Sequence, residues 1–180
     1  EVIHENIIAN ESEISAISAI CSGTPNGTTL VLSNSMVIRD AELAILNTGN
    51  SFRTITNRGA NGIDGVVSTS IGVAEANKGN TVCILGDIAA VHDIGGFLAA
   101  LRLQTELTIV VLDNGGGGIF SFLPVKESIE EETFKEFYLT PPKLPVPEIL
   151  IAAGVDVRIP TSLNQLTEEV TSTISEGGLK

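Results

Sequence analysis

Two side chains with oxygen donors, Asp87 and Asn114, lie where apolar runs of the sequence end. Asp87 follows TVCILG, and Asn114 follows LTIVVLD, 27 residues further along the chain. Carboxylate and amide oxygens suit Mg²⁺ and Ca²⁺, which keep part of their coordination shell for substrate phosphates. Taken singly, each residue is better explained as an ordinary turn residue. Together, at this spacing, they predict a site for a hard cation and a phosphate.

Four glycines, Gly115 to Gly118, follow directly. A stretch without side chains can offer a carbonyl to a metal and N–H groups to phosphate oxygens, although ordering it costs conformational entropy. Apolar residues then resume at Ile119 and Phe120. We therefore interpret VVLDNGGGGIF as a ligand-binding loop and not as a flexible linker.

The sequence lacks the motifs of several other kinds of binding or catalytic site. The glycines of GANGIDG do not match the dinucleotide pattern G-x-G-x-x-G, and neither a P-loop nor a G-x-S-x-G elbow is present. Two cysteines and two histidines leave a zinc site short of ligands unless carboxylates take part. We interpret His92 as a polar loop or capping residue in preference to a base. Cys83, in TVCIL, is interpreted as a small buried apolar residue.

The charge of the chain limits its partners. A net charge of -12 over 180 residues argues against nucleic acid and against an anionic membrane surface. No apolar run is long enough to span a bilayer, and no signal peptide is apparent. We expect a cytoplasmic protein, or a plastid protein in a photosynthetic eukaryote. The chain starts without Met, which favours a fragment, a processed product or a trimmed chain.

The elements that must position the site alternate along the chain. Ile14, Ala16, Ile17 and Ile20 recur at helical spacing after two capping candidates, Asn10 and Ser12. Strands are expected at 28–34, 53–57, 81–87, 107–113 and 155–159, and further helices at 39–47, 64–77, 93–104, 147–154 and 163–174. The segment 126–137 is acidic, and 140–148 is a proline-rich connector.

This alternation predicts the fold. Strands that are apolar throughout and separated by helices indicate an α/β three-layer sandwich, in which a mostly parallel sheet is covered by helices on both faces. We find no domain boundary and expect one domain, 1–180. Ligands bind such sheets outside the carboxyl ends of the strands. The loops at those ends are 33–40, 57–65, 86–93 and 112–120.

The residues of these loops resemble a known family. GD at 86–87, followed by Asn114 and glycines, resembles the GDG…NN motif of thiamine-diphosphate enzymes. SNSMVIRD, NRGANGIDG and GGGIFSFLP together are similar to the C-terminal, diphosphate-binding domain of the menaquinone-pathway synthases that make 2-succinyl-5-enolpyruvyl-6-hydroxy-3-cyclohexene-1-carboxylate (SEPHCHC). The resemblance is strong from Asn34 to Pro124 and weaker beyond. It implies that the chain is the C-terminal part of a larger enzyme.

The resemblance implies roles for particular residues. Asp87, Asn114 and the carbonyl of Gly116 would ligate Mg²⁺ (or Mn²⁺), which would bridge the diphosphate of thiamine diphosphate. The cofactor-binding residues would be Ile63, Gly86, Asp87, Ile88, Ala89, Asn114, Gly116 and Ile119. The substrate-binding residues would be Ser35, Arg39, Arg58, Ile119 and Phe120. For the two arginines, a surface ion pair with Asp40 or Asp64 remains the alternative.

The implied reaction is decarboxylation of 2-oxoglutarate and addition of the resulting carbanion to isochorismate. No catalytic residue is expected in this chain, because the glutamate that activates the cofactor's pyrimidine belongs to another domain. The implied partners are a pyrimidine-binding domain, in cis or in trans, and further copies in a homo-dimer or homo-tetramer. We expect the chain to be inactive alone.

The sequence departs from the family pattern at three positions. Ala89 stands where a polar residue usually follows, Asp113 replaces the first Asn of the pair, and Gly115 replaces a residue that often has a side chain. Two alternatives therefore remain. The chain could be the diphosphate-binding subunit of a split 2-oxo acid decarboxylase, or a non-catalytic module that keeps the fold.

Overall fold

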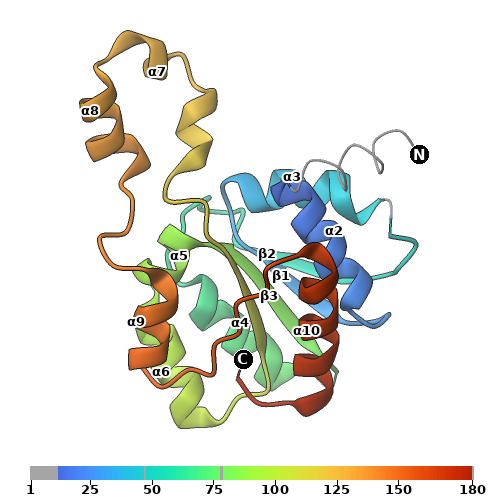
Figure 1. Cartoon of the computed structure of the whole chain (residues 1–180). Coiled ribbons are helices and arrows are strands. Elements are labelled where there is room, and N and C mark those ends of the chain that lie inside the picture. The colour runs from blue at the N-terminus through green and yellow to red at the C-terminus, as the bar shows by residue number, and fades with distance from the viewer. Residues whose placement is uncertain (1–11, 47, 78, 180) are drawn as a thin grey trace.

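The computed structural model describes residues 12–46, 48–77 and 79–179. Its sheet has four parallel strands, β1 (Thr29–Leu32), β2 (Arg53–Thr56), β3 (Thr81–Gly86) and β4 (Thr108–Leu112), in the order β2-β1-β3-β4. β1 pairs with β2 on one side and β3 on the other (Figure 1). The chain order therefore reverses between β1 and β3, which is the switch point where such sheets bind ligands.

One face of the sheet is covered by α2 (Glu13–Gly23), α3 (Met36–Ile45) and α10 (Leu163–Glu176). Leu30 and Leu32 of β1 pack into this layer. Helices α2 and α10 approach closely at Gly23, where an added Cβ would lie 2.5 Å from the carbonyl oxygen of Thr167. Ser12 caps α2 by accepting from the N–H of Ser15; the other capping candidate, Asn10, lies outside the described residues.

The opposite face is covered by α4 (Val66–Ala76), α5 (Asp87–His92), α6 (Ile94–Leu103) and α9 (Val146–Ala152). Val31 and Cys83, the strand residues that alternate with those of the first face, pack here. Gly96 lets α6 lie against α4, since an added Cβ would be 2.9 Å from Val67. Helices thus cover both faces of an all-parallel sheet, and the expected α/β sandwich is confirmed.

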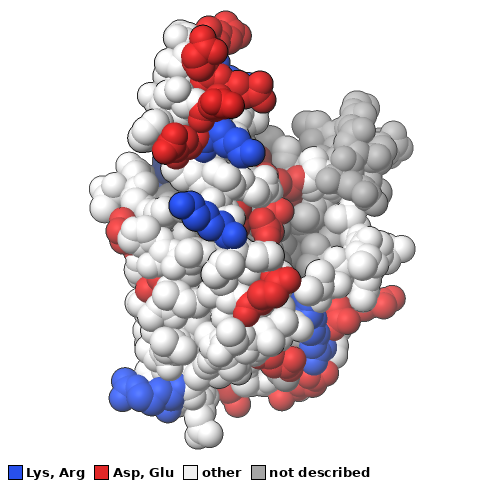
Figure 2. Space-filling model, turned by 60° about the vertical axis from the view of Figure 1, so that its left-hand side comes forward, with Lys and Arg blue, Asp and Glu red and all other residues white. Residues whose placement is uncertain are grey.

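An arm leaves the sheet after β4 and returns before α9 (Figure 1). It contains the 3₁₀ turn η1 (Gly118–Phe122), α7 (Val125–Ser128), α8 (Glu131–Phe134) and the π-helical turn η2 (Lys135–Leu139). Phe134 stacks on Tyr138 at 5.5 Å, and Tyr138 meets Phe120 edge to face at 5.6 Å. Acidic side chains gather at the end of the arm (Figure 2). The predicted acidic segment is therefore several short turns on this arm.

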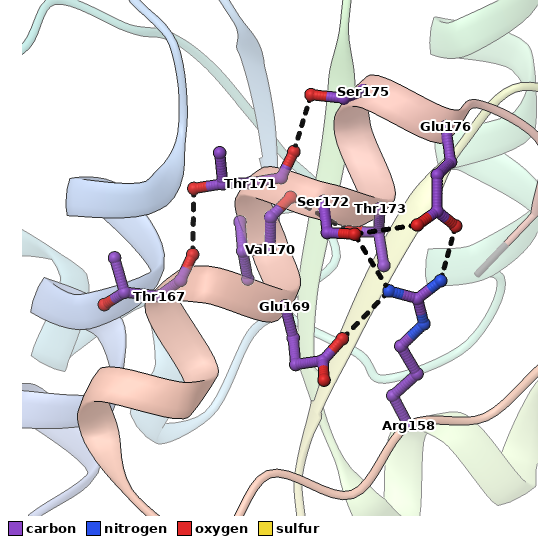
Figure 3. A network of polar contacts seen from close by, with 9 residues as sticks. All are labelled: Arg158, Thr167, Glu169, Val170, Thr171, Ser172, Thr173, Ser175 and Glu176. Carbon is purple, nitrogen blue, oxygen red and sulfur yellow. Dashed lines mark hydrogen bonds and ion pairs between the residues drawn. The ribbon is translucent and has the colours of Figure 1, made fainter.

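The strand expected at 155–159 is wrong, because this segment is not hydrogen-bonded to the sheet. A cavity of about 410 Å³ is lined by β4 and by residues 155–160. Arg158 is held by α10: it donates to Glu169 at 2.9 Å and also to Glu176 and Ser172 (Figure 3). Among the described residues, β4 is therefore the edge strand of the sheet on this side.

The segment after β3 differs from the prediction. The residues after β3 form α5 directly, where a loop was expected, and His92 lies in its last turn. Its Nε2 is 3.6 Å from Oδ1 of Asp64, and both side chains are exposed.

Within the described ranges, no helix combines the length and the apolar character needed to cross a bilayer.

Candidate functional site

A pocket of about 480 Å³ lies at the carboxyl ends of the strands, at the switch point of the sheet. Residues from all four strand-end loops line it. It brings together ten of the twelve site residues expected from the sequence: Ser35, Ile63, Gly86, Asp87, Ile88, Ala89, Asn114, Gly116, Ile119 and Phe120. The parallel strands cause this convergence, because their carboxyl ends share one edge.

Asp87 is the buried carboxylate of this pocket, with 2% of its surface exposed. Its Oδ1 accepts from the N–H of Ile88 at 2.8 Å, while its buried Oδ2 has no hydrogen-bond partner. Burial raises the pKa of this carboxyl, and the charge of Asp113 adds to the effect, against the backbone N–H groups of Ile88 and Gly116. An unpaired buried carboxylate oxygen is costly, and a bound cation would remove that cost.

Asn114 and the glycines close one side of the pocket. Nδ2 of Asn114 donates to Oε1 of Glu13 at 2.7 Å. Gly116 has φ = +132°, and an added Cβ there would lie 2.2 Å from the carbonyl oxygen of Leu139. Gly117 is crowded in the same way by Tyr138, whereas Gly115 faces open space. The bare backbone at 116 and 117 thus admits the returning arm, a role that the sequence did not suggest.

Asn34 is a pocket residue that sequence reasoning did not select. It is 1% exposed, and its Nδ2 donates to the carbonyl oxygens of Asn57 and Gly62, which joins the loops after β1 and β2. Its buried Oδ1 has no partner. The signal that points to it is a polar residue at the carboxyl end of an apolar strand, the same signal that selected Asp87.

The backbone is strained around the pocket. Four non-glycine residues among those described have positive φ, and three of them, Ser35 (67°), Asn61 (58°) and Thr140 (41°), line this pocket. Such conformations cost free energy and persist where the surrounding structure imposes them, often at functional sites. This clustering supports a binding role for the pocket independently of its side chains.

The two arginines lie outside the pocket lining. Arg39, on α3, is exposed and donates to the carbonyl oxygen of Ser35, and Arg58 is exposed in the loop after β2. In the described part of the chain, neither forms an ion pair with Asp40 or Asp64. Both belong to segments that contribute to the pocket, since Met36 of α3 and Asn61 of the loop after β2 line it, but neither arginine does.

The structure also shows where Ala89 and Asp113, two of the departures from the family pattern, lie. Ala89 lines the pocket but is buried, and it packs into the core beneath α5. The carboxylate of Asp113 accepts from the N–H of Gly115 at 3.2 Å, and Asp113 lines the other cavity, beside β4. The extra acid thus accepts from its own loop, and its charge also raises the pKa of Asp87 in the pocket.

The donors present fit a hard divalent cation. Asp87 offers a free carboxylate oxygen, Asn114 an amide oxygen, and the glycine run offers carbonyls. In the described ranges, no group of three or more His, Cys, Asp or Glu side chains is placed to hold a metal ion. A site with one carboxylate suits an ion that completes its shell with phosphate oxygens.

The two cysteines, Cys21 and Cys83, do not line the pocket. Both are buried, and burial raises the pKa of each thiol to about 12.

Comparison with known proteins agrees with this geometry. Residues 42–179 match the family described as "Thiamine pyrophosphate enzyme, C-terminal TPP binding domain". The chain is 36% identical over 179 residues to the SEPHCHC synthase of Myxococcus xanthus, covering 99% of this chain and 29% of that protein. It is 44% identical over 117 residues to the SEPHCHC synthase of Bacillus velezensis, covering 65% of this chain and 20% of that one.

Solved structures share the fold. The benzoylformate decarboxylase of Polynucleobacter necessarius superposes with a TM-score of 0.74 at 18% identity, over 93% of this chain and 32% of that one. A 4-hydroxybenzoylformate decarboxylase of Rhodococcus jostii gives 0.73 at 15%, over 92% and 31%. The chain therefore spans less than a third of the length of these relatives. The family match, the parallel sheet and the pocket at its switch point agree, and the chain belongs to the C-terminal TPP-binding domains of thiamine pyrophosphate enzymes.

Proposed function

We propose that the pocket binds the diphosphate of thiamine diphosphate through Mg²⁺ or Mn²⁺. The observation that carries this proposal is Asp87, a buried carboxylate with one oxygen unpaired at the carboxyl edge of the sheet. Oδ2 of Asp87, the amide oxygen of Asn114 and the carbonyl of Gly116 would be the metal ligands. Gly86, Ile88 and Ala89 would lie against the diphosphate, because they form the turn from β3 into α5.

The apolar residues of the pocket would hold the rest of the cofactor. Ile63 is packed against the core and lines the pocket, so it would support the cofactor from below. Ile119 and Phe120 would form an apolar wall that keeps water from the reacting atoms. Thiamine diphosphate, when bound, supplies the electron sink for decarboxylation, while this chain binds and orients it.

For the reaction we propose that of SEPHCHC synthase: decarboxylation of 2-oxoglutarate and transfer of the remaining fragment to isochorismate, in menaquinone biosynthesis. Relatives that bear this name cover up to 99% of the chain. Both substrates are dicarboxylates, and arginine binds carboxylates with paired hydrogen bonds. Arg39 and Arg58, together with Ser35, would bind them at the mouth of the pocket.

This activity needs more than the present chain. The relatives are more than three times as long, and a pyrimidine-binding domain, in cis or in trans, would supply the glutamate that activates the cofactor. We propose that the 180 residues alone turn over nothing, and that the working form is a homo-dimer or homo-tetramer in a cytoplasm or a plastid.

The test is Asp87→Asn in the complete enzyme. The change keeps the shape of the side chain but removes the charge, so affinity for thiamine diphosphate with Mg²⁺ should fall by at least about 100-fold if the metal requires the carboxylate. The free energy of unfolding without ligand should stay the same or rise at pH 7, because a buried charge is removed. Calorimetry measures the first quantity and urea unfolding the second.

Asp113→Asn is the matched control. It removes a charge that acts on Asp87 but is not itself a proposed metal ligand, so cofactor affinity should fall far less than in Asp87→Asn. Normal cofactor binding by Asp87→Asn would overturn the proposed site. An equal loss of binding in both variants would mean that the negative charge around Asp87, and not ligation by Asp87, controls cofactor binding.

A further inference from the structure

Glu13 contacts the proposed metal ligand Asn114 from a distant part of the chain. It is the first residue of α2 and lines the pocket. Its Oε1 accepts from Nδ2 of Asn114 at 2.7 Å, across 101 positions of sequence. None of the roles proposed above uses this contact.

The hydrogen-bonding groups of Glu13 and Asn114 fix the orientation of the Asn114 amide. A carboxylate can only accept hydrogen bonds, whereas an amide donates from its nitrogen and accepts at its oxygen. Glu13 therefore requires Nδ2 of Asn114 to face it. Oδ1, on the other branch of the amide, is directed away from Glu13 and left without a competing donor from this residue. An amide free to flip would have to give up this freedom when its oxygen binds a cation.

Gly118 leaves room for the same amide. An added Cβ at Gly118 would lie 3.0 Å from Nδ2 and 4.0 Å from Oδ1 of Asn114. A side chain at this position would therefore press on the nitrogen that donates to Glu13.

The helix does not need Glu13 for capping. Ser12 already accepts from the N–H of Ser15, and Glu13 occupies the first helical position, where an acid interacts favourably with the helix dipole but accepts no capping bond. An acid at this place also adds negative charge to a pocket proposed to hold an anion. That electrostatic cost is understandable if the carboxylate has a task within the site.

We infer that Glu13 is a positioning residue, which orients Asn114 so that its amide oxygen faces the cation of the diphosphate site. The inference rests on the proposed function. It extends the metal site beyond the strand-end loops to the N-terminus of α2, so that the site draws on both helix layers of the sheet.

The experiment compares Glu13→Ala with Glu13→Gln in the complete enzyme. Affinity for Mg²⁺ is measured by calorimetry at saturating thiamine diphosphate, and the electron paramagnetic resonance spectrum of bound Mn²⁺ reports its ligands. Glu13→Ala should weaken Mg²⁺ binding about 10- to 100-fold, the usual effect of losing a residue that orients a ligand, and should alter the Mn²⁺ spectrum. Glu13→Gln should restore most of the affinity, because its amide oxygen can still accept from Asn114.

Glu148→Ala is the matched control. Glu148 is an acid in the first turn of α9 and does not line the pocket, so its removal costs the same dipole interaction but should leave Mg²⁺ affinity unchanged. Gly118→Ala supplies a second route: it displaces Nδ2 while Glu13 stays in place, and it should weaken Mg²⁺ binding in the same direction even if Glu13→Ala does not fold.

Three outcomes would overturn the inference: unchanged Mg²⁺ affinity in Glu13→Ala, equal losses in Glu13→Ala and Glu13→Gln, or an equal loss in Glu148→Ala. The failure of this inference is distinguishable from that of the proposed function. If Asp87→Asn abolishes binding while Glu13→Ala leaves it intact, only the role of Glu13 is wrong. If Asp87→Asn binds normally, the metal site itself is wrong.

Discussion

Asp40 and Asp87 are the two acids that lie almost fully buried among the described residues, at 6% and 2% exposure. They differ in what surrounds them. Asp87 lines the pocket, and its raised pKa accompanies an unpaired oxygen that a cation can use. Asp40 lies on α3, outside the pocket lining, where burial and the nearby charge of Glu13 raise its pKa to about 6, against the opposing charge of Arg39. The burial of Asp87 thus prepares it to bind a cation, whereas the burial of Asp40 only lowers the stability of the fold.

We therefore expect Asp40→Asn to stabilise the protein at neutral pH. Because the pKa is raised from 3.8 to about 6 on folding, the folded state holds the proton more tightly than the unfolded state. The ionised form is thus destabilising above pH 6, and this penalty disappears as the pH falls below about 4. The substitution should raise the free energy of unfolding at pH 7.5 by at most about 3 kcal/mol, with a much smaller gain at pH 4.

Urea unfolding at both pH values measures this effect. Glu42→Gln, which removes an exposed acid from the same helix, is the control and should show little difference at either pH. A gain for Asp40→Asn that is as large at pH 4 as at pH 7.5 would contradict the assignment of the raised pKa to this residue.

At the scale of elements, the glycine run is explained by what packs against it. The N–H of Gly117 donates to the carbonyl oxygen of Leu139 at 2.7 Å, which fastens the returning end of the arm to the loop after β4. This contact leaves no room for a side chain at Gly116. The arm and the loop after β4 are therefore one structural unit.

Gly116→Ala should consequently be far more damaging than Gly115→Ala. Both glycines have positive φ, but a Cβ at 116 meets backbone at 2.2 Å, whereas a Cβ at 115 meets nothing within 4 Å. Gly115→Ala should cost roughly 1–2 kcal/mol from backbone strain alone. Gly116→Ala should cost more and should also weaken cofactor binding, as thermal unfolding with and without cofactor measures. Equal costs at the two positions would contradict the packing of the arm on this loop.

At the scale of the whole molecule, charge constrains how the pocket can bind an anion. The described residues that line it include Glu13, Asp64 and Asp87, but no Lys or Arg, and the chain as a whole carries a net charge of -12. A diphosphate entering alone meets acids of the same sign. A divalent cation reverses the sign of the local field, so binding of the metal and of the diphosphate should be strongly linked.

We expect thiamine diphosphate with EDTA to give almost no thermal stabilisation of the complete enzyme. Together with Mg²⁺ at about 100 times the dissociation constant, it should add about 2.7 kcal/mol to the free energy of unfolding. Thermal unfolding of the four combinations of cofactor and metal measures the linkage. A full shift with thiamine diphosphate in EDTA would show that the acids of the pocket do not control binding.

Much of this architecture was predictable, because its signals are local. Apolar runs and helical spacing predicted β1 to β4, and α2, α4, α6, α9 and α10, in their order along the chain. The parallel arrangement follows from strands that alternate with helices, and it brings Asp87 and Asn114 to one edge. The expectation at 155–159 was wrong for a non-local reason: VDVRI has the pattern of a strand, but in the fold it does not join the sheet, and Arg158 pairs with Glu169 and Glu176 of α10.

The sequence by itself determined the fold class, the family resemblance and ten of the residues that line the pocket, since short motifs and periodicity encode them. Only the tertiary structure decided that Glu13 reaches Asn114, that Asn34 joins two loops, and that Gly116 must be bare because Leu139 lies against it. These contacts join positions far apart in the chain. No local pattern records them, because each partner looks ordinary until the fold brings it to the other.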